Sequence, residues 1–114
     1  MASYRSVTVY CSSSNVIRPI FTDAAEQLGA EFARCHIQLV NGGGSVGLMG
    51  VMARAVHDKG GRVVGVIPKR LKSIEGRAYE ASDELILTET MRDRKRIMYE
   101  RSDAYVALAG GYGT

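Results

Sequence analysis

The sequence contains little proline, cysteine or histidine and no long apolar run. Of its 114 residues, two are proline, two cysteine and two histidine. Cys11, Cys35, His36 and His57 lack the spacing of a CxxC motif or of metal ligands, which predicts reduced thiols and no metal site. No apolar run approaches the roughly twenty residues of a transmembrane helix, and the first strand pattern begins too early for a signal peptide. We therefore expect a cytoplasmic protein without a membrane partner.

The sequence also lacks a strong charge of either sign. Fifteen basic residues against twelve acidic ones give a formal net charge of +3 at pH 7. A nucleic-acid partner normally requires a dense basic stripe, so this weak balance predicts no nucleic-acid binding. The weak positive charge suits an anionic small molecule better. We also expect no cofactor.

What the sequence does contain is a regular alternation of strand and helix patterns. Apolar, β-branched runs predict strands at residues 6–11, 37–40, 62–67, 85–87 and 104–108. Helical spacing predicts helices from Pro19 to residue 35, from about residue 46 to 58 and from 91 to 102, with a loop and one helical turn at 69–81. Continuously apolar strands are typical of a sheet buried on both faces. The order predicts one α/β domain over residues 1–114, a Rossmann-like open parallel sheet with helices on both faces.

The second predicted strand ends in a glycine-rich turn, residues 42–47, that contains the G-x-G-x-x-G pattern of dinucleotide-binding folds. Two features argue against a dinucleotide. The turn follows the second strand instead of the first, and the next strand ends at Pro68-Lys69 without an acidic residue for a ribose. Ser45 is the candidate N-cap of the following helix. The turn either seats a phosphate or lets helix and sheet pack closely, and the sequence leaves both possibilities open.

The predicted helix 91–102 carries several basic residues. Thr90 followed by Asp93 resembles a capping box at its start. At about 100° per residue, one face collects Met91, Arg94, Lys95, Met98 and Arg101. The methionines are natural inward anchors, so Arg94 and Lys95 should point toward the interior or its rim, where a cation needs a partner. That partner is a bound anion or one of Glu80, Glu84 and Glu89, unless the side chains reach back to solvent.

The chain ends in Gly-Gly-Tyr-Gly-Thr, residues 110–114, directly after the last predicted strand. In an open α/β sheet, ligands bind beyond the carboxyl ends of the strands, which favours a phosphate seat here over a plain tight turn. Such a turn normally leads into a helix whose N-terminal amides complete the site. No helix pattern follows, so we expect the chain to be a fragment with an incomplete domain.

Together these motifs resemble the family of cytokinin riboside 5′-monophosphate phosphoribohydrolases, whose members are often labelled lysine decarboxylases. The resemblance covers nearly the whole chain. Residues 9–14 are similar to the family's first loop, residues 42–50 to its glycine segment, and residues 66–68 and Met91 with Arg94-Lys95 also fit. Residues 110–114 resemble the beginning of the family signature P-G-G-x-G-T-x-x-E.

The resemblance implies hydrolysis of the N-glycosidic bond of a purine riboside 5′-monophosphate, such as AMP or isopentenyl-AMP, to free base and ribose 5-phosphate. It implies that Arg94 is a catalytic residue, that Lys95 beside it binds the substrate and that Glu80 reaches the substrate. The family's nucleotide-binding loop corresponds to Gly110, Gly111, Tyr112, Gly113 and Thr114. The resemblance also implies a homodimer with the active site near the interface.

The sequence departs from the family pattern at two places. Ala109 replaces the signature proline, and the signature glutamate would fall three residues beyond Thr114. Because a carboxylate stabilises the oxocarbenium-like state of glycosidic cleavage, we expect the 114-residue chain by itself to be inactive. The main alternative is a nucleotide-binding or molybdenum-cofactor carrier module without turnover. A decarboxylase would use a lysine-bound pyridoxal phosphate, for which Lys95 beside Arg94 is a poor candidate.

Overall fold

The computed structural model describes residues 5–11, 18–74 and 76–108. Within them, strands form one sheet in the order β4-β3-β2-β1-β5, and every pair of neighbours is parallel. The strand bounds are β1 Arg5–Tyr10, β2 Ile37–Asn41, β3 Val63–Pro68, β4 Glu84–Thr88 and β5 Ala104–Ala107. This arrangement confirms the predicted α/β fold with an open parallel sheet.

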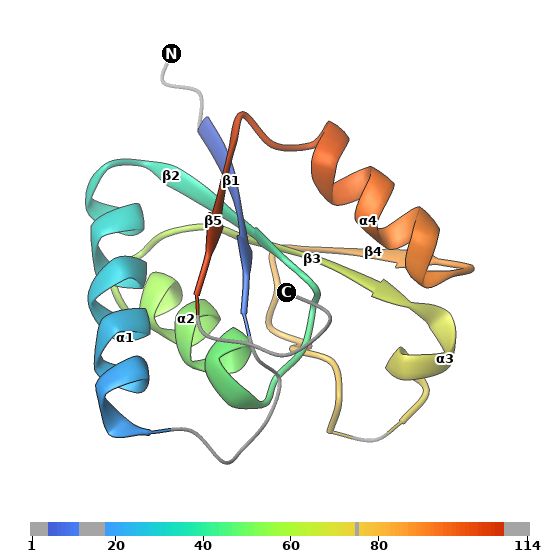
Figure 1. The fold of residues 1–114 in the computed structure, drawn as a ribbon, viewed down its shortest axis with the longest axis horizontal. Helices are drawn as coiled ribbons and strands as arrows, with labels where there is room; N and C mark the ends of the chain where they lie inside the picture. The colour runs from blue at the N-terminus through green and yellow to red at the C-terminus, as the bar shows by residue number, and fades with distance from the viewer. Residues whose placement is uncertain (1–4, 12–17, 75, 109–114) are drawn as a thin grey trace.

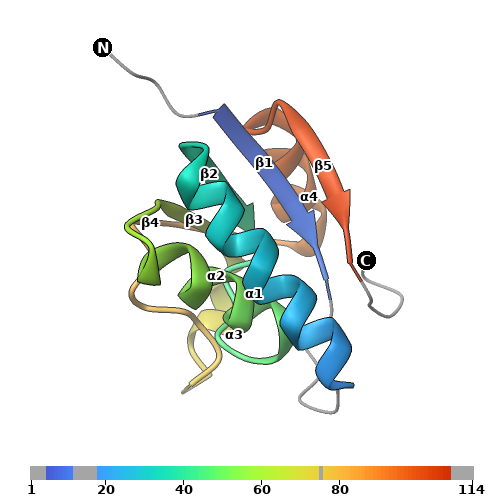
Figure 2. The same cartoon turned by 90° about the vertical axis from the view of Figure 1, so that its left-hand side faces the viewer.

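The helices cover both faces of the sheet. They are α1 Pro19–Arg34, α2 Gly47–Asp58, the short α3 Lys69–Lys72 and α4 Met91–Glu100. Figures 1 and 2 show α1 and α2 side by side on one face and α4 on the other. The core is divided in the same way, because Leu39 joins the cluster under α1 and α2 whereas its neighbour Val40 packs with Met98 of α4. None of the helices in the described part of the chain is both long and apolar enough to span a membrane.

The strand β5 has no fully buried residue, so burial on both faces does not extend to this strand. Ala104, Tyr105 and Ala107 are exposed, and Val106 is half-buried. The strand lies at one edge of the sheet, where β1 is its partner among the described strands. Its tyrosine stacks on Tyr99 with 5.5 Å between the ring centroids. An apolar run therefore identified the strand correctly but gave no information about its place in the sheet.

The two predicted helix caps have opposite outcomes. Ser45 is not the N-cap of α2, because the cap is Val46 and the Ser45 hydroxyl donates to the carbonyl oxygen of Gly76. Thr90 does cap α4, since its Oγ1 accepts from the backbone N–H of Asp93 at 3.0 Å. The helix α4 then ends at Glu100, somewhat earlier than predicted.

The carboxyl end of α4 is attached to the central strand β1. Thr8 is fully buried, and its hydroxyl lies 3.2 Å from the carbonyl oxygen of Met98 and within hydrogen-bond distance of Ser102 Oγ. Met98 itself is only 3% exposed. These contacts fix the orientation of α4 on the sheet and therefore the direction in which its basic residues point.

Candidate functional site

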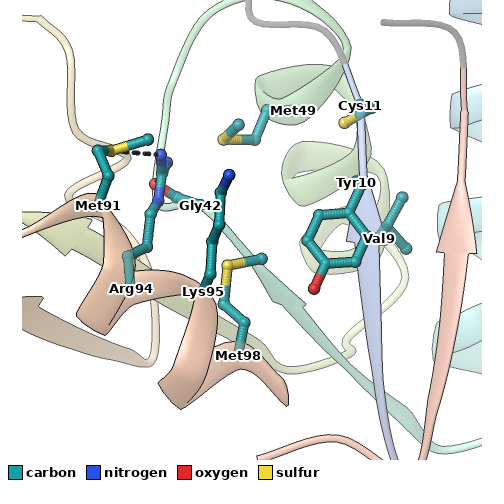
Figure 3. Close-up of a pocket in the computed structure, with 9 residues that line it drawn as sticks. All are labelled: Val9, Tyr10, Cys11, Gly42, Met49, Met91, Arg94, Lys95 and Met98. Carbon is teal, nitrogen blue, oxygen red and sulfur yellow. Dashed lines mark hydrogen bonds between the residues drawn. The ribbon is translucent and has the colours of Figure 1, made fainter. Parts of the chain in front are cut away.

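A pocket lies between α4 and the carboxyl ends of β1 and β2 (Figure 3). Ligands of open α/β sheets bind at this end of the strands. Four of the lining side chains carry sulfur, and the two basic ones come from α4. The lining residues are Val9, Tyr10, Cys11, Gly42, Met49, Met91, Arg94, Lys95 and Met98.

Arg94 is held at the pocket by backbone carbonyl groups. Its Nε donates to the carbonyl oxygen of Val66 at 2.9 Å, and its Nη2 donates to that of Gly42. Nη1 lies 3.5 Å from the Met91 sulfur. Burial lowers the pKa of Arg94 from its ordinary value, but a guanidinium remains charged in proteins. Carbonyl oxygens orient this charge without neutralising it.

The carboxylates that were alternative partners for Arg94 pair with other cations. Glu80 lies 3.3 Å from Lys72, Glu84 lies 2.7 Å from Arg101, and Glu89 lies 2.6 Å from Lys69. Within the described residues, no carboxylate forms an ion pair with Arg94 or Lys95. The ion pair that was one alternative for Arg94 is therefore absent among the described residues, and the pocket wall keeps an excess of positive charge.

Lys95 differs from Arg94 in burial. Arg94 is half-buried, as the helical spacing predicts for the inward face, whereas Lys95 is exposed. Figure 3 nevertheless shows the Lys95 side chain extending in the same direction as Arg94, toward Met49. Two adjacent cations, one held by carbonyl groups and one exposed, therefore face the same pocket.

The glycine-rich turn after β2 uses its amides inside the protein. Gly43 donates to Asn41 Oδ1 at 2.9 Å, Gly44 to Met49 Sδ at 3.0 Å and Ser45 to the carbonyl oxygen of Arg77 at 2.9 Å. Gly43 has a φ of +74°, a conformation that favours glycine. Of the two possibilities left open by the sequence, these contacts favour close packing over a phosphate seat.

A chain of polar side chains fastens the segment after α3 to α2. His57 lies 2.7 Å from the Tyr79 hydroxyl through Nδ1 and 2.8 Å from Asp83 Oδ2 through Nε2. The same carboxylate oxygen accepts the N–H of Val63 at 2.7 Å. The backbone N–H of Tyr79 in turn donates to the carbonyl oxygen of Gly43 at 2.8 Å. The glycine-rich turn is thereby attached to this polar chain as well as to Arg94.

With this geometry established, comparison with known proteins identifies the family. Residues 49–114 match the family described as "Possible lysine decarboxylase". The chain belongs to this family. It is 48% identical over 113 residues to a probable cytokinin riboside 5′-monophosphate phosphoribohydrolase of Oryza sativa subsp. japonica, covering 97% of this chain and 45% of the relative. It is 46% identical to a cytokinin riboside 5′-monophosphate phosphoribohydrolase of Arabidopsis thaliana, covering 97% of this chain and 52% of the relative.

The chain spans about half the length of these curated relatives. Among solved structures, it is similar to the molybdenum cofactor carrier protein of Chlamydomonas reinhardtii, with a TM-score of 0.81 and 24% sequence identity. That likeness covers 97% of this chain and 66% of the carrier chain. At this identity, the likeness concerns the fold alone.

The family match includes α4, and the structure brings two of the predicted site residues together there. Arg94 and Lys95 both line the pocket. Glu80 does not line it and forms its ion pair with Lys72 on an exposed turn. The loop Gly110 to Thr114 and Ala109 lie outside the described residues. Among the described residues, no group of three or more His, Cys, Asp and Glu side chains could hold a metal ion.

Several residues of the site were not found from the sequence. The position of Cys11 directly after β1 was an available signal, because the carboxyl ends of neighbouring parallel strands meet at one edge. Burial raises the pKa of the Cys11 thiol to about 11, so it stays protonated at neutral pH and is a poor nucleophile. The carbonyl of Gly42 and the His57 contacts gave no local signal, because their partners are far away in the sequence.

Proposed function

We propose that the protein hydrolyses the N-glycosidic bond of purine riboside 5′-monophosphates to free base and ribose 5-phosphate. The observation that carries the proposal is the pair of cations, Arg94 and Lys95, at a pocket whose described residues offer them no carboxylate. A phosphomonoester would supply the missing negative charge. The names of the curated relatives supply the substrate class.

The geometry of Arg94 suits contact with a ligand rich in oxygen. The guanidinium has more N–H donors than the two carbonyl groups use, and the donors that remain are fixed in one plane. In the proposed reaction, a water oxygen bonds to C1′ as the bond to the purine nitrogen breaks, and a proton goes to the departing base. Positive charge develops on the ribose, so Arg94 belongs on the phosphate or on a hydroxyl and not against the sugar ring.

The finer assignments belong to the same proposal. Lys95 binds the 5′-phosphate, Gly110 to Thr114 form the nucleotide-binding loop, and Glu80 contacts the substrate after leaving Lys72. The carboxylate that stabilises the oxocarbenium-like state follows Thr114 by the family resemblance. The protein acts as a cytoplasmic homodimer.

A pyridoxal phosphate decarboxylase, which the family description suggests, is not supported by the pocket. Such a site needs a lysine for the Schiff base and usually a carboxylate or arginine near the pyridine nitrogen. The pocket lining does include an arginine, Arg94, but its lysine, Lys95, is exposed instead of enclosed in an apolar wall.

The test measures release of free base and ribose 5-phosphate from AMP and isopentenyl-AMP by chromatography. It compares the 114-residue chain with the same chain followed by the C-terminal half of the Oryza relative. We expect turnover in the extended protein and none in the chain alone. Arg94→Ala should lower the rate of the extended protein roughly 100-fold or more, as expected for loss of a group that contacts the reacting substrate.

Arg92→Ala is the matched control. Arg92 is exposed on the other side of α4 and does not line the pocket. Its loss should leave turnover unchanged. Retained AMP binding without turnover in the extended protein would instead support a binding module of the carrier type, and loss of both would contradict a nucleotide site altogether.

A further inference from the structure

The contact between Gly42 and Arg94 joins two segments that are far apart in the sequence. The Gly42 carbonyl oxygen accepts from Arg94 Nη2 across a separation of 52 residues, and the Val66 carbonyl oxygen accepts from Nε across 28. Gly42 follows β2, and Val66 lies in the neighbouring strand β3. The guanidinium therefore lies against the backbone at the carboxyl end of the sheet, at the wall of the pocket (Figure 3).

This position exists only because residue 42 has no side chain. A Cβ atom built at Gly42 would lie 2.6 Å from Arg94 Cζ and 3.1 Å from Nε, and closer still to Nη2. The three nearest atoms to that Cβ all belong to the Arg94 guanidinium. Gly42 is not among the glycines with positive φ, so alanine fits the backbone conformation there. The obstacle to a larger residue is Arg94 itself.

The turn cannot easily move away to make room. The neighbouring Gly43 donates to Asn41 Oδ1 at 2.9 Å and accepts the N–H of Tyr79 at 2.8 Å. Ser45 is held by the carbonyl of Arg77 at 2.9 Å. A methyl group at position 42 is therefore attached to an anchored turn and meets the flexible side chain of Arg94. The flexible side chain is the part that moves.

We propose that Gly42 is a positioning residue for Arg94: the bare backbone at position 42 holds the guanidinium at the pocket in the orientation that binds the nucleotide. The binding half of this statement rests on the proposed function. In the Gly42→Ala protein, the guanidinium loses the Gly42 carbonyl and leaves the pocket wall. Binding should then suffer as if Arg94 were absent, although Arg94 is still present.

The coupling is tested first by stability, without any ligand. Gly42→Ala should lower the midpoint of thermal unfolding in the otherwise unchanged chain, because it breaks the contact with Arg94. With Arg94→Ala in the same chain, the space is free, and Gly42→Ala should leave the midpoint unchanged or raise it, since alanine reduces the freedom of the unfolded chain. This change of sign is specific to a contact between the two residues. Equal losses in both backgrounds would overturn the coupling.

The positioning role is tested by calorimetric titration of AMP. Arg94→Ala should weaken AMP binding about tenfold or more, as expected for the loss of a charge-assisted contact. Gly42→Ala should weaken it by a similar factor, and the double variant by no more than Arg94→Ala alone. Wild-type affinity in Gly42→Ala would overturn the positioning role.

Gly29→Ala is the control for a destabilising substitution away from the pocket. Its Cβ would lie 2.7 Å from Ala55 Cβ, between α1 and α2. Gly29→Ala should lower the unfolding midpoint and leave AMP affinity unchanged. Its effect on the midpoint should be the same whether or not Arg94→Ala is also present. Failure of the unsubstituted chain to bind AMP would contradict the proposed function, and the stability comparison would still decide whether Gly42 and Arg94 are coupled.

Discussion

Asp83 gives a prediction whose size can be worked out contact by contact. One carboxylate oxygen accepts from the Val63 N–H at 2.7 Å and from His57 Nε2 at 2.8 Å. Val63 is fully buried, so its N–H would have no solvent to replace Asp83. Loss of the acceptor should therefore cost about 1–3 kcal/mol. The His57 contact is more exposed, with 22% and 35% of the two side chains accessible, and should contribute about 0–1 kcal/mol.

Two substitutions separate these contributions. Asp83→Ala removes both contacts and should lower the free energy of unfolding by about 1–4 kcal/mol at pH 7. Asp83→Asn keeps an oxygen that can accept from Val63, so it should lose only about 1 kcal/mol or less. Urea unfolding monitored by circular dichroism gives both values. Equal losses for alanine and asparagine would refute the assignment of the larger share to the buried N–H of Val63.

The same residue predicts a pH dependence. Burial by itself raises the pKa of Asp83, but hydrogen bonds from His57 and the Val63 N–H, with the charges of His57 and Arg62, outweigh it and leave the pKa below its ordinary value. A lowered pKa stabilises the folded chain above the unfolded-state value of about 3.9, and this contribution is lost as the pH falls through the folded-state pKa. The difference in free energy of unfolding between the unsubstituted chain and Asp83→Asn should therefore shrink below about pH 4. A difference in free energy of unfolding that stays constant from neutral pH to below about pH 4 would contradict this reasoning.

Three further predictions concern the core, the caps and the thiols. Met98→Ala should lower the free energy of unfolding by about 2–5 kcal/mol in urea titrations, because Met98 of α4 is 3% exposed and packs against β2 and β3. Thr90→Ala should cost about 1 kcal/mol through loss of the α4 cap, whereas Ser45→Ala should cost less than half of that in the same assay. Iodoacetamide at pH 8 should alkylate the exposed Cys35 well before Cys11, which is buried and has a pKa of about 11; mass spectrometry of timed samples would show the order.

The sequence was sufficient to predict the layers of the fold. Leu39 and Val40 are adjacent and both apolar because β2 is covered on both faces, and that pattern predicted a parallel sheet between helices. The edge position of β5 could not be predicted in this way. Tyr105 and Val106 resemble residues of an inner strand, and strand order depends on pairing with β1, which lies about a hundred residues earlier.

The site was predictable only where it depends on local geometry. Helical spacing correctly predicted that Arg94 points toward the sheet, because side chains one turn apart share a face. Its carbonyl partners were not predictable, since they come from β3 and from the end of β2. Ser45 failed as a helix cap for a similar reason: a distant segment, Gly76 and Arg77, binds it instead.

The sulfur-rich lining of the pocket has a consequence for selectivity. Thioether side chains are flexible and polarizable, so a wall made of Met49, Met91 and Met98 adapts to the outline of whatever lies against it. Such a wall tolerates differences in shape and imposes little penalty on a slightly larger or smaller ring system. The fixed guanidinium of Arg94, in contrast, requires a ligand group of matching charge and position. Differences in affinity between ligands of this pocket should therefore depend mainly on the charged group of the ligand, and the apolar part can vary with little effect.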